Sequence, residues 1–408
     1  MKRGFRCTRE MGVLVCVAFV IMFGFILQAH AAEKLKIGVI IPLTGPVAEG
    51  GTRMLKAFEL ARDEINAKGG VLGREIELVP WDDGDKVERG ITGAKKLIDV
   101  DNVFCLAGVY RSGIALPVSD IAANSKKIFM VTDAASPDIT GKVLQDYNTY
   151  KYIFRAAAST DHFALIVTPF LTDIIKAKSY YYMSENTKWT QDLGKTLRKF
   201  ADEKGIKFLG ESLSDPGATE FMSEITKIKE LKPDAVVCTL AGAGGIPFAK
   251  QYYDMKAGSP IVHAPGTMTF KSVIDEMKEK SDYASVSAFC WDVAITDKTI
   301  PFYKKYTEKY DRPGGYEDVR SYDGLYVITE GIKKAGTFDT EKVISALEKI
   351  EYKGVAGRYV FDKSHQAQFR DGYLTGVIIE WKNQKSNILY PANVATSKYI
   401  PSPWSIKK

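Results

Sequence analysis

The stretch "KIGVIIPLTGPVAEGG", Lys36 to Gly51, decides the fold class of this chain. An apolar run ends at Pro42, a glycine-bearing loop follows, and apolar residues then recur at helical spacing from Met54 to Ile65. A continuous apolar run bounded by turn residues is typical of a strand buried on both faces of a parallel sheet. Because nucleotide-binding domains begin in the same order, we first ask whether this loop binds a phosphate.

The loop lacks the glycine patterns that bind phosphate. Its glycines do not form G-x-G-x-x-G, and the chain contains no G-x-x-x-x-G-K-[ST] and no G-x-S-x-G elbow. His162, His263 and His365 are too scattered to predict a metal cluster. The "DDGD" run at residues 82–85 does not match an EF-hand loop, so we expect a solvated turn with a helix cap there. We therefore predict no metal, no cofactor and no enzymatic activity.

Strand and helix patterns alternate from Leu35 onward, which predicts parallel sheets with right-handed crossovers and helices on both faces. The pattern restarts after "YIFRAA", so we expect two Rossmann-like lobes joined by a three-segment hinge. The first lobe is predicted to comprise residues 32–155 and 291–368, and the second residues 156–290 and 369–408. The end of the chain reads as two strands of the second lobe. The predicted helices include residues 114–125, 161–177, 189–204, 219–231, 300–310, 321–334 and 340–347.

The first residues read as an export signal. Four basic residues precede the apolar run Met11 to Leu27, and Ala29 to Ala31 supplies small residues for cleavage after Ala31. We expect a cleavable signal peptide, residues 1–31, and a periplasmic protein; an uncleaved membrane anchor is the alternative. Cleavage would leave 377 residues. This length exceeds the roughly 250–300 residues that one core supports, which again favours two lobes.

Charge and cysteines narrow the class of protein further. The formal charge is +6, and the predicted leader carries +3 of it, so the remaining chain has no basic surplus that favours nucleic acid. Cys105, Cys238 and Cys290 lie in predicted strands and are expected to be buried free thiols. One disulfide bond, such as Cys105–Cys238, remains an alternative. We expect a monomer.

Small and hydroxyl residues follow two predicted strands of the first lobe. Ser112 lies at a helix start, and Ala134 and Ser136 follow the next strand. In open parallel sheets ligands bind beyond the carboxyl ends of the strands, where helix N-termini converge. Several N–H and O–H donors together suit a carboxylate. The alternative reading, in which both serines only cap helices, is equally compatible with the sequence.

Four segments carry a family resemblance: "KIGVIIPLTGPVAEGG…ARDEINAKGGVLGREIELVPWDD", "LPVSDIAANSKKIFMVTDAASPDIT", "YDGLYVITEGIKKAG" and "FDKSHQAQF". They resemble periplasmic solute-binding proteins of the leucine/isoleucine/valine type, the type I receptors of bacterial ABC importers. The resemblance implies two Rossmann-like lobes joined by three segments, with a ligand clamped between them. It also implies ABC permease subunits in the inner membrane as partners.

The family's binding positions are only partly retained. Its carboxylate clamp falls on Ser112, Ala134 and Ser136, which keep the required residue types. Its first-loop aromatic falls on Gly50, its second-lobe tyrosine on Ala241, and the glutamate that holds the α-ammonium falls near Pro265. An α-ammonium buried without a carboxylate partner is unfavourable by several kcal/mol. If this alignment holds, the ligand is not a simple α-amino acid, and the small residues open volume for a bulkier one.

Four further residues are candidates for ligand contact. Arg111 offers a bidentate partner for an acid, and Tyr110 and Trp189 offer rings for stacking. Asp161 either contacts an amine of the ligand or acts as the N-cap of its own helix. Arg111 as an outward surface residue and Trp189 as packing for a helix end remain alternatives. The expected ligand bears a carboxylate and is an organic acid, an aromatic acid or an amino acid.

The sequence therefore predicts an extracytoplasmic receptor of a branched-chain-amino-acid-type ABC importer. The alternative is a ligand-sensing protein of the same fold, with a regulatory or chemosensory role. A secreted enzyme is disfavoured because no reactive cluster is found.

Overall fold

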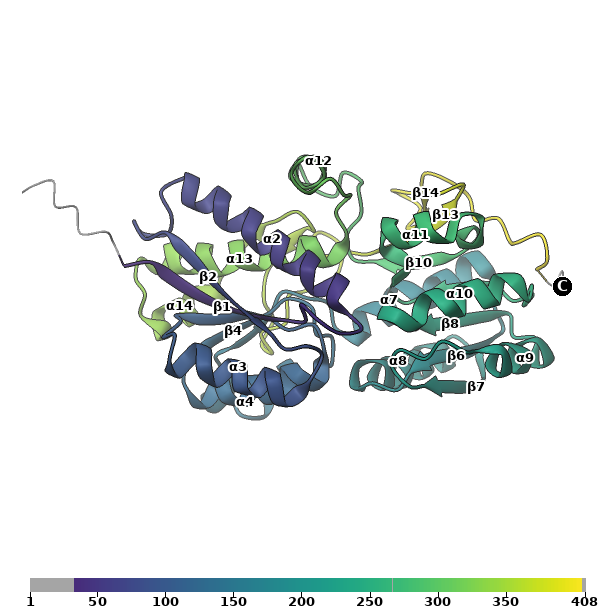
Figure 1. Cartoon of the computed structure of the whole chain (residues 1–408), viewed down its shortest axis with the longest axis horizontal. Helices are drawn as coiled ribbons and strands as arrows, with labels where there is room; N and C mark the ends of the chain where they lie inside the picture. Colours follow the sequence, from purple (N-terminus) through teal and green to yellow (C-terminus); the bar gives the residue numbers. More distant parts are fainter. Residues whose placement is uncertain (1–32, 266, 406–408) are drawn as a thin grey trace, which may run out of the picture.

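The computed structural model describes residues 33–265 and 267–405, and the predicted signal peptide lies outside these residues. Two lobes lie side by side, each built on its own sheet (Figure 1). In the first lobe five parallel strands follow the order β2-β1-β3-β4-β5. The predicted doubly wound class is confirmed. The strands are β1 (Leu35–Ile41), β2 (Ile76–Asp82), β3 (Cys105–Gly108), β4 (Ile128–Val131) and β5 (Ile153–Arg155).

Helices cover both faces of the first sheet because its strands are apolar on both faces. Helices α2 and α13 pack together on one face, and α3 and α4 on the other (Figure 1). The core of this lobe also takes in residues far along the chain, including Val319, Leu325 and Leu347. The helices are α2 (Ala48–Ala67), α3 (Val87–Asp99), α4 (Ser112–Asn124), α5 (Asp138–Gln145), α6 (Tyr147–Tyr150), α12 (Thr299–Tyr310), α13 (Tyr316–Ala335) and α14 (Thr340–Leu347).

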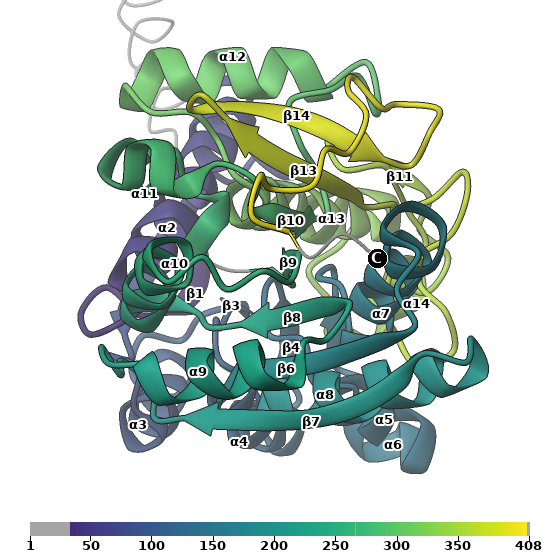
Figure 2. The same cartoon turned by 90° about the vertical axis from the view of Figure 1, so that its right-hand side faces the viewer.

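The second lobe holds a seven-stranded sheet in the order β14-β13-β10-β9-β8-β6-β7 (Figure 2). Its parallel part runs from β10 to β7. Strand β13 pairs antiparallel to β10 and β14 pairs antiparallel to β13, so the end of the chain forms two strands of the second lobe, as the sequence predicts. The strands are β6 (Ser179–Glu185), β7 (Lys207–Ser214), β8 (Ala235–Thr239), β9 (Ile261–His263), β10 (Ser285–Ala288), β13 (Val377–Lys382) and β14 (Lys385–Tyr390).

Two helices pack on one face of the second sheet and three on the other. The first pair is α7 (Thr160–Pro169) and α8 (Lys188–Glu203). The other three are α9 (Met222–Leu231), α10 (Gly245–Asp254) and α11 (Lys271–Met277). Short elements complete the chain: η1 (Phe170–Ile175), η2 (Gly242–Gly244), η3 (Thr267–Thr269), η4 (Lys278–Ser281), β11 (Tyr352–Lys353) and β12 (Arg358–Tyr359).

Several predicted helix limits are wrong. The helix predicted for 161–177 is α7 followed by the π-helical turn η1, which ends at Lys176 in a left-handed conformation. The helix predicted from residue 219 begins at Met222. The helix predicted from residue 321 begins at Tyr316, and the missed turn matters because it faces the space between the lobes. Helices α5 and α11 were not predicted.

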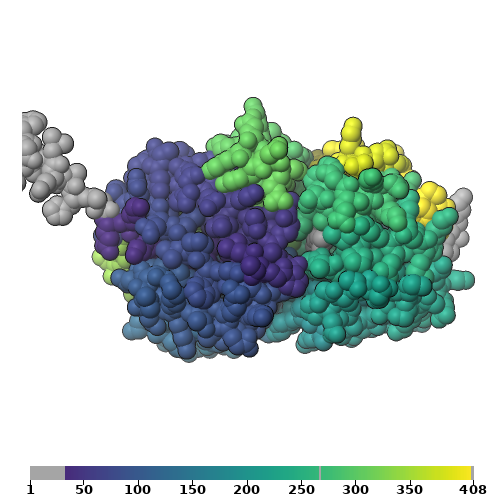
Figure 3. All heavy atoms as spheres, in the orientation of Figure 1, coloured from purple at the N-terminus to yellow at the C-terminus, as the bar shows by residue number. Residues whose placement is uncertain are grey.

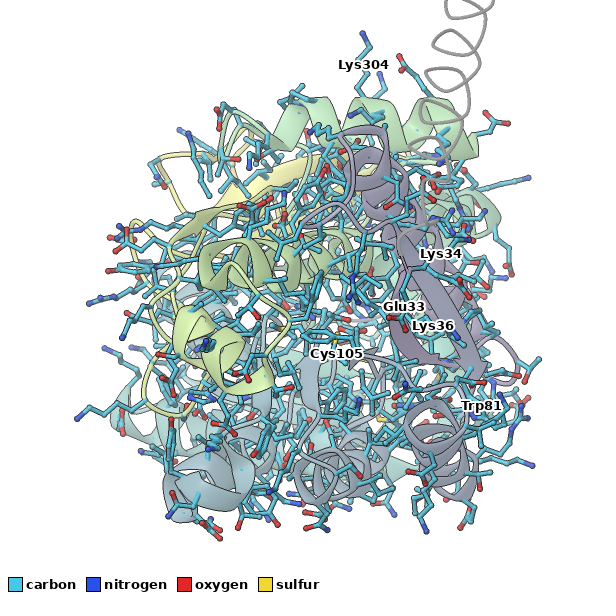
Figure 4. The ribbon with its side chains drawn as sticks, turned by 90° about the vertical axis from the view of Figure 1, so that its left-hand side faces the viewer. Glu33, Lys34, Lys36, Trp81, Cys105 and Lys304 are labelled. Carbon is cyan, nitrogen blue, oxygen red and sulfur yellow. The ribbon has the colours of Figure 1, made fainter. Side chains whose placement is uncertain are left out.

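Cys105, Cys238 and Cys290 are free and buried, so the expected free thiols are confirmed. Cys105 lies inside the first lobe, while Lys304 on α12 points outward (Figure 4). Cys290 lies two residues beyond β10 rather than within a strand. Within residues 33–265 and 267–405, no helix combines the length and apolar character needed to cross a membrane. The same residues contain no group of three or more histidine, cysteine or acidic side chains arranged to hold a metal.

Candidate functional site

The loops that follow β1, β3 and β4 meet at the edge of the first sheet that faces the second lobe. This follows from parallel pairing, which brings the carboxyl ends of neighbouring strands together. The loop after β1 reaches the second lobe, and Pro46 lies so close to Gly242 that a Cβ there would stand 2.6 Å from its carbonyl oxygen. In Figure 3 the purple N-terminal segment abuts the green second lobe. The lobes are closed on each other.

Ser112, Ala134 and Ser136 lie together as predicted, and each of them makes hydrogen bonds within the protein. The Ser112 Oγ accepts hydrogen bonds from the N–H groups of Ala135 and Ser136, at 3.1 and 3.0 Å. The N–H of Ala134 donates to the Val109 carbonyl at 3.0 Å. The Ser136 hydroxyl donates to Asp192 of the second lobe at 2.6 Å. In the closed form these groups therefore hold the loops and the lobes together.

Arg111 joins the lobes as well. Its guanidinium donates to Asp85 of the first lobe at 3.0 Å and to Glu185, at the end of β6 in the second lobe. Arg111 and Glu185 are both buried, so the alternative of an outward surface arginine is wrong. Burial opposes the arginine's charge, but the carboxylates of Glu185 and Asp85 outweigh it and raise the pKa of Arg111.

The acidic run at residues 82–85 is not the solvated turn that the sequence predicts. Asp82 accepts hydrogen bonds from the N–H groups of Leu43 and Thr44, at 2.8 and 3.1 Å, and so ties down the loop after β1. Although partial burial opposes ionisation, hydrogen bonds from Thr44 and from backbone N–H groups lower the pKa of Asp82 to about 2. Asp83 is buried, which raises its pKa to about 6. Helix α3 has no side-chain cap from this run.

A cavity of about 360 Å³ lies between the lobes. The first lobe supplies charge and the second apolar surface. Four predicted contact residues line this cavity: Tyr110, Trp189, Ala241 and Pro265. Five further lining residues were not predicted: Asp133, Ala135, Phe163, Tyr316 and Arg320. A helix-start signal in the sequence, Gly315 followed by Glu317 and Asp318, would have revealed Tyr316 and Arg320.

The other predicted contact residues do not line this cavity. Gly50 does not line this cavity, and the ring of Tyr110 fills the space beside it. Arg111 and Ser112 line a neighbouring hollow, which also shares Trp189. Asp161 is exposed and accepts a hydrogen bond from Thr196 at 3.2 Å. It does not cap its helix, since the N-cap position is held by Ser159.

Charged groups surround the cavity on the first-lobe side. Arg320 donates to Asp133 at 2.7 Å, and the guanidinium packs against the rings of Phe289 and Tyr316, 4.6 and 4.4 Å from their centres. Its Nη2 is buried and has no hydrogen-bond partner among the described residues. Burial raises the pKa of Asp133, and Arg320 offsets part of that shift.

Glu317 is a second acid close to the pair formed by Arg320 and Asp133. Glu317 is fully buried, and burial together with the charge of Asp133 raises its pKa. Another cavity, of about 440 Å³, lies far from these groups at the opposite edge of the seven-stranded sheet, under the C-terminal segment with Tyr399 and Trp404. The cavity of about 360 Å³ between the lobes is the candidate site because both lobes line it and it contains four of the predicted contact residues.

Two parallel-sheet lobes closed over a cavity define a two-lobed binding protein. A family model described as "Periplasmic binding protein" matches residues 34–383, and the chain belongs to this family. It is similar to the Leu/Ile/Val-binding protein BraC3 of Rhizobium johnstonii, with 27% identity over 78% of this chain and 84% of that protein. The predicted resemblance to leucine/isoleucine/valine-type binding proteins is confirmed.

Two solved structures share the fold. The branched-chain amino acid binding protein LivJ of Streptococcus pneumoniae, in complex with isoleucine, superposes with a TM-score of 0.78 at 21% identity, covering 88% of this chain and all of that one. A solute-binding protein of an ABC transporter from R. palustris, in complex with benzoate, has a TM-score of 0.77 at 20% identity, covering 91% and 99%. At this identity the likeness establishes the fold alone.

Proposed function

We propose that this protein is the extracytoplasmic receptor of a branched-chain-amino-acid-type ABC importer. It clamps a small, carboxylate-bearing ligand between its lobes and catalyses no reaction. The observation that carries the proposal is the cavity of about 360 Å³, lined by Tyr110 and Arg320 of one lobe and by Phe163 and Trp189 of the other. A site shared by two lobes binds ligand fully only when they are closed, which couples binding to shape.

Closure rests on polar contacts between the lobes. Arg111 with Glu185 and Ser136 with Asp192 join groups of opposite lobes, and Lys188 pairs with Asp138 across the same gap at 2.6 Å. These contacts form only in the closed form, so ligand binding and lobe contacts stabilise one conformation together. The permease subunits in the inner membrane would then recognise that closed form.

The ligand is proposed to differ from a simple α-amino acid. Asp133 is the acid that lines the cavity, and its Oδ1 already accepts from Arg320. At the position expected near Pro265 no acidic side chain lines the cavity within the described residues. An α-ammonium would therefore find one carboxylate in the cavity, and Arg320 already neutralises the charge of that carboxylate.

The test is a ligand screen on refolded, ligand-free protein by thermal shift, with organic acids, aromatic acids and branched-chain amino acids at matched concentrations. A ligand that binds only the folded state raises the free energy of unfolding by about 2.7 kcal/mol at a hundredfold excess over Kd, and the thermal midpoint rises accordingly. We expect organic or aromatic acids to give the largest shifts. Strong stabilisation by leucine or valine, with none by acids, would contradict the proposed ligand class.

Export and a role in transport can be tested separately. N-terminal sequencing of protein from the periplasm should begin at Ala32, whereas an intact N-terminus would favour the membrane anchor. Permease and ATPase genes beside this gene would favour transport over sensing. Sedimentation should give a monomer.

A further inference from the structure

We infer that Arg320 is the residue that binds the acid group of the ligand, and that the ligand is a compact aromatic carboxylate. This inference rests on the proposed function and assigns the recognition in its site. The acid group would meet Nη2 of Arg320, and the ring would lie among Tyr110, Phe163 and Trp189.

The guanidinium of Arg320 is held ready for an anion. The rings of Phe289 and Tyr316 both pack against it, with centres 4.6 and 4.4 Å away, and Asp133 accepts from Nη1 at 2.7 Å. Arg320 is 3% exposed and lines the cavity. Its Nη2 is buried and has no acceptor among the described residues. A buried charged donor without an acceptor is costly, and a carboxylate in the cavity would remove that cost.

The charge balance around Nη2 favours an anion over a cation. The charge of Asp133 is paired with Arg320. The other nearby acid, Glu317, is kept toward its neutral form because burial raises its pKa. Tyr110 and Tyr316 stay protonated, since burial raises the pKa of both hydroxyls. An incoming carboxylate would therefore meet one cationic edge that has no acceptor among the described residues.

The serine clamp does not compete for this role in the closed form. The Oγ of Ser112 already accepts from two N–H groups, and the hydroxyl of Ser136 donates to Asp192. Neither serine lines the cavity that holds Arg320. Recognition of the acid by a side chain of α13 would thus replace recognition by the strand-end loops.

The walls of the cavity favour an aromatic ring. Tyr110, Phe163, Trp189 and Tyr316 all line it, and aromatic side chains pack against a bound ring in offset-stacked or edge-to-face arrangements. A single-ring acid is the class that satisfies both the arginine and the walls.

Calorimetric titration tests the inference with three probes: benzoate, the uncharged isostere benzamide, and isoleucine. We expect the unaltered protein to bind benzoate at least tenfold more tightly than benzamide. Arg320→Gln should weaken benzoate at least thirtyfold and leave benzamide within threefold, and Arg320→Lys should fall between. Arg198→Gln is the matched control, because Arg198 pairs with Glu211 on the exposed face of α8.

Two further variants test whether lost binding is due to misfolding, and whether the site binds an amine through Asp133 instead of an acid through Arg320. Asp133→Asn/Arg320→Gln removes both partners of the pair, so it leaves no unpaired charge and should fold while losing benzoate binding. Asp133→Asn alone should keep or strengthen benzoate binding, because it frees Nη1. If Asp133 instead held an amine, this variant would abolish isoleucine binding, and that result would overturn the inference.

The remaining outcomes separate the inference from the proposed function. Equal benzoate affinity in Arg320→Gln and in the unaltered protein would overturn the role of Arg320 and leave the receptor proposal intact. Binding of isoleucine without benzoate would overturn the aromatic class and the proposed ligand class together. Failure of every compound in the wider thermal-shift screen would contradict the receptor proposal itself.

Discussion

The ring of Tyr110 occupies the space that a side chain at Gly50 would need. A Cβ at Gly50 would lie 2.8 Å from Cε2 of Tyr110 and 3.3 Å from its Cζ. Gly50 lies in the first turn of α2, and Tyr110 lies in the loop after β3, so the ring from that loop packs against the start of α2. The missing first-loop aromatic is thus replaced from another loop, and the expected open volume beside Gly50 is wrong.

Gly50→Ala should be destabilising because Tyr110 must shift to admit the methyl group. Overpacking of this kind costs about 1–3 kcal/mol, and the displaced ring should also weaken ligand binding. Gly141→Ala is the control, since a Cβ at this helical glycine meets nothing within 4 Å. It should be neutral or stabilising by up to about 1 kcal/mol. Urea unfolding compares the two, and equal effects would contradict the packing argument.

Arg111→Ala should favour the open form. It leaves Glu185 buried without its partner, and breaking a buried pair costs about 3–5 kcal/mol. We expect weaker ligand binding and a larger radius of gyration by small-angle scattering. Arg111→Ala/Glu185→Gln should recover part of the loss, while Arg198→Ala, at an exposed pair, should change stability by less than about 1 kcal/mol. A double-mutant cycle without coupling would refute this contact between the lobes.

Glu380→Gln should stabilise the protein in a pH-dependent way. Glu380 on β13 is 2% exposed, and burial raises its pKa to about 7, with Lys382 opposing the shift. Above its ordinary pKa of about 4.3 the unfolded chain ionises while the folded one stays protonated, so stability falls until about pH 7. The variant should therefore gain up to about 3 kcal/mol at pH 8 and little at pH 4. Thermal unfolding at pH 4 and at pH 8 measures the gain in stability. An equal gain at both pH values would exclude the ionisation of Glu380 as the cause of the gain.

The buried thiols should resist alkylation. Burial raises the pKa of Cys105 and Cys238 to about 12 and raises that of Cys290 as well, so the reactive thiolate is scarce. Iodoacetamide should label these residues in guanidinium chloride and leave them unmodified in native protein, as peptide mass spectrometry would reveal. Labelling of native Cys290 at the same rate as denatured Cys290 would show that the lobe opens there.

Local patterns predicted the strands well because each strand carries its own burial signal. The run Ile37–Ile41 has no polar side chain, whichever partners it meets, and it forms most of β1, which lies between β2 and β3. The adjacency of Ser112 and Ser136 was also predictable, since parallel strands bring their carboxyl ends together. The start of α13 was placed five residues late, and that error hid Tyr316 and Arg320.

The sequence by itself determined the fold class, the family and the order of elements, because periodic burial and strand ends are local properties of the chain. Only the tertiary structure decided which side chains meet between the lobes. Arg320 stands beside Asp133, 187 residues earlier, and beside Phe289 of the other lobe. No local pattern encodes such contacts, since they depend on how two separate sheets close on each other. The same closure pairs the Ser136 hydroxyl with Asp192 of the second lobe.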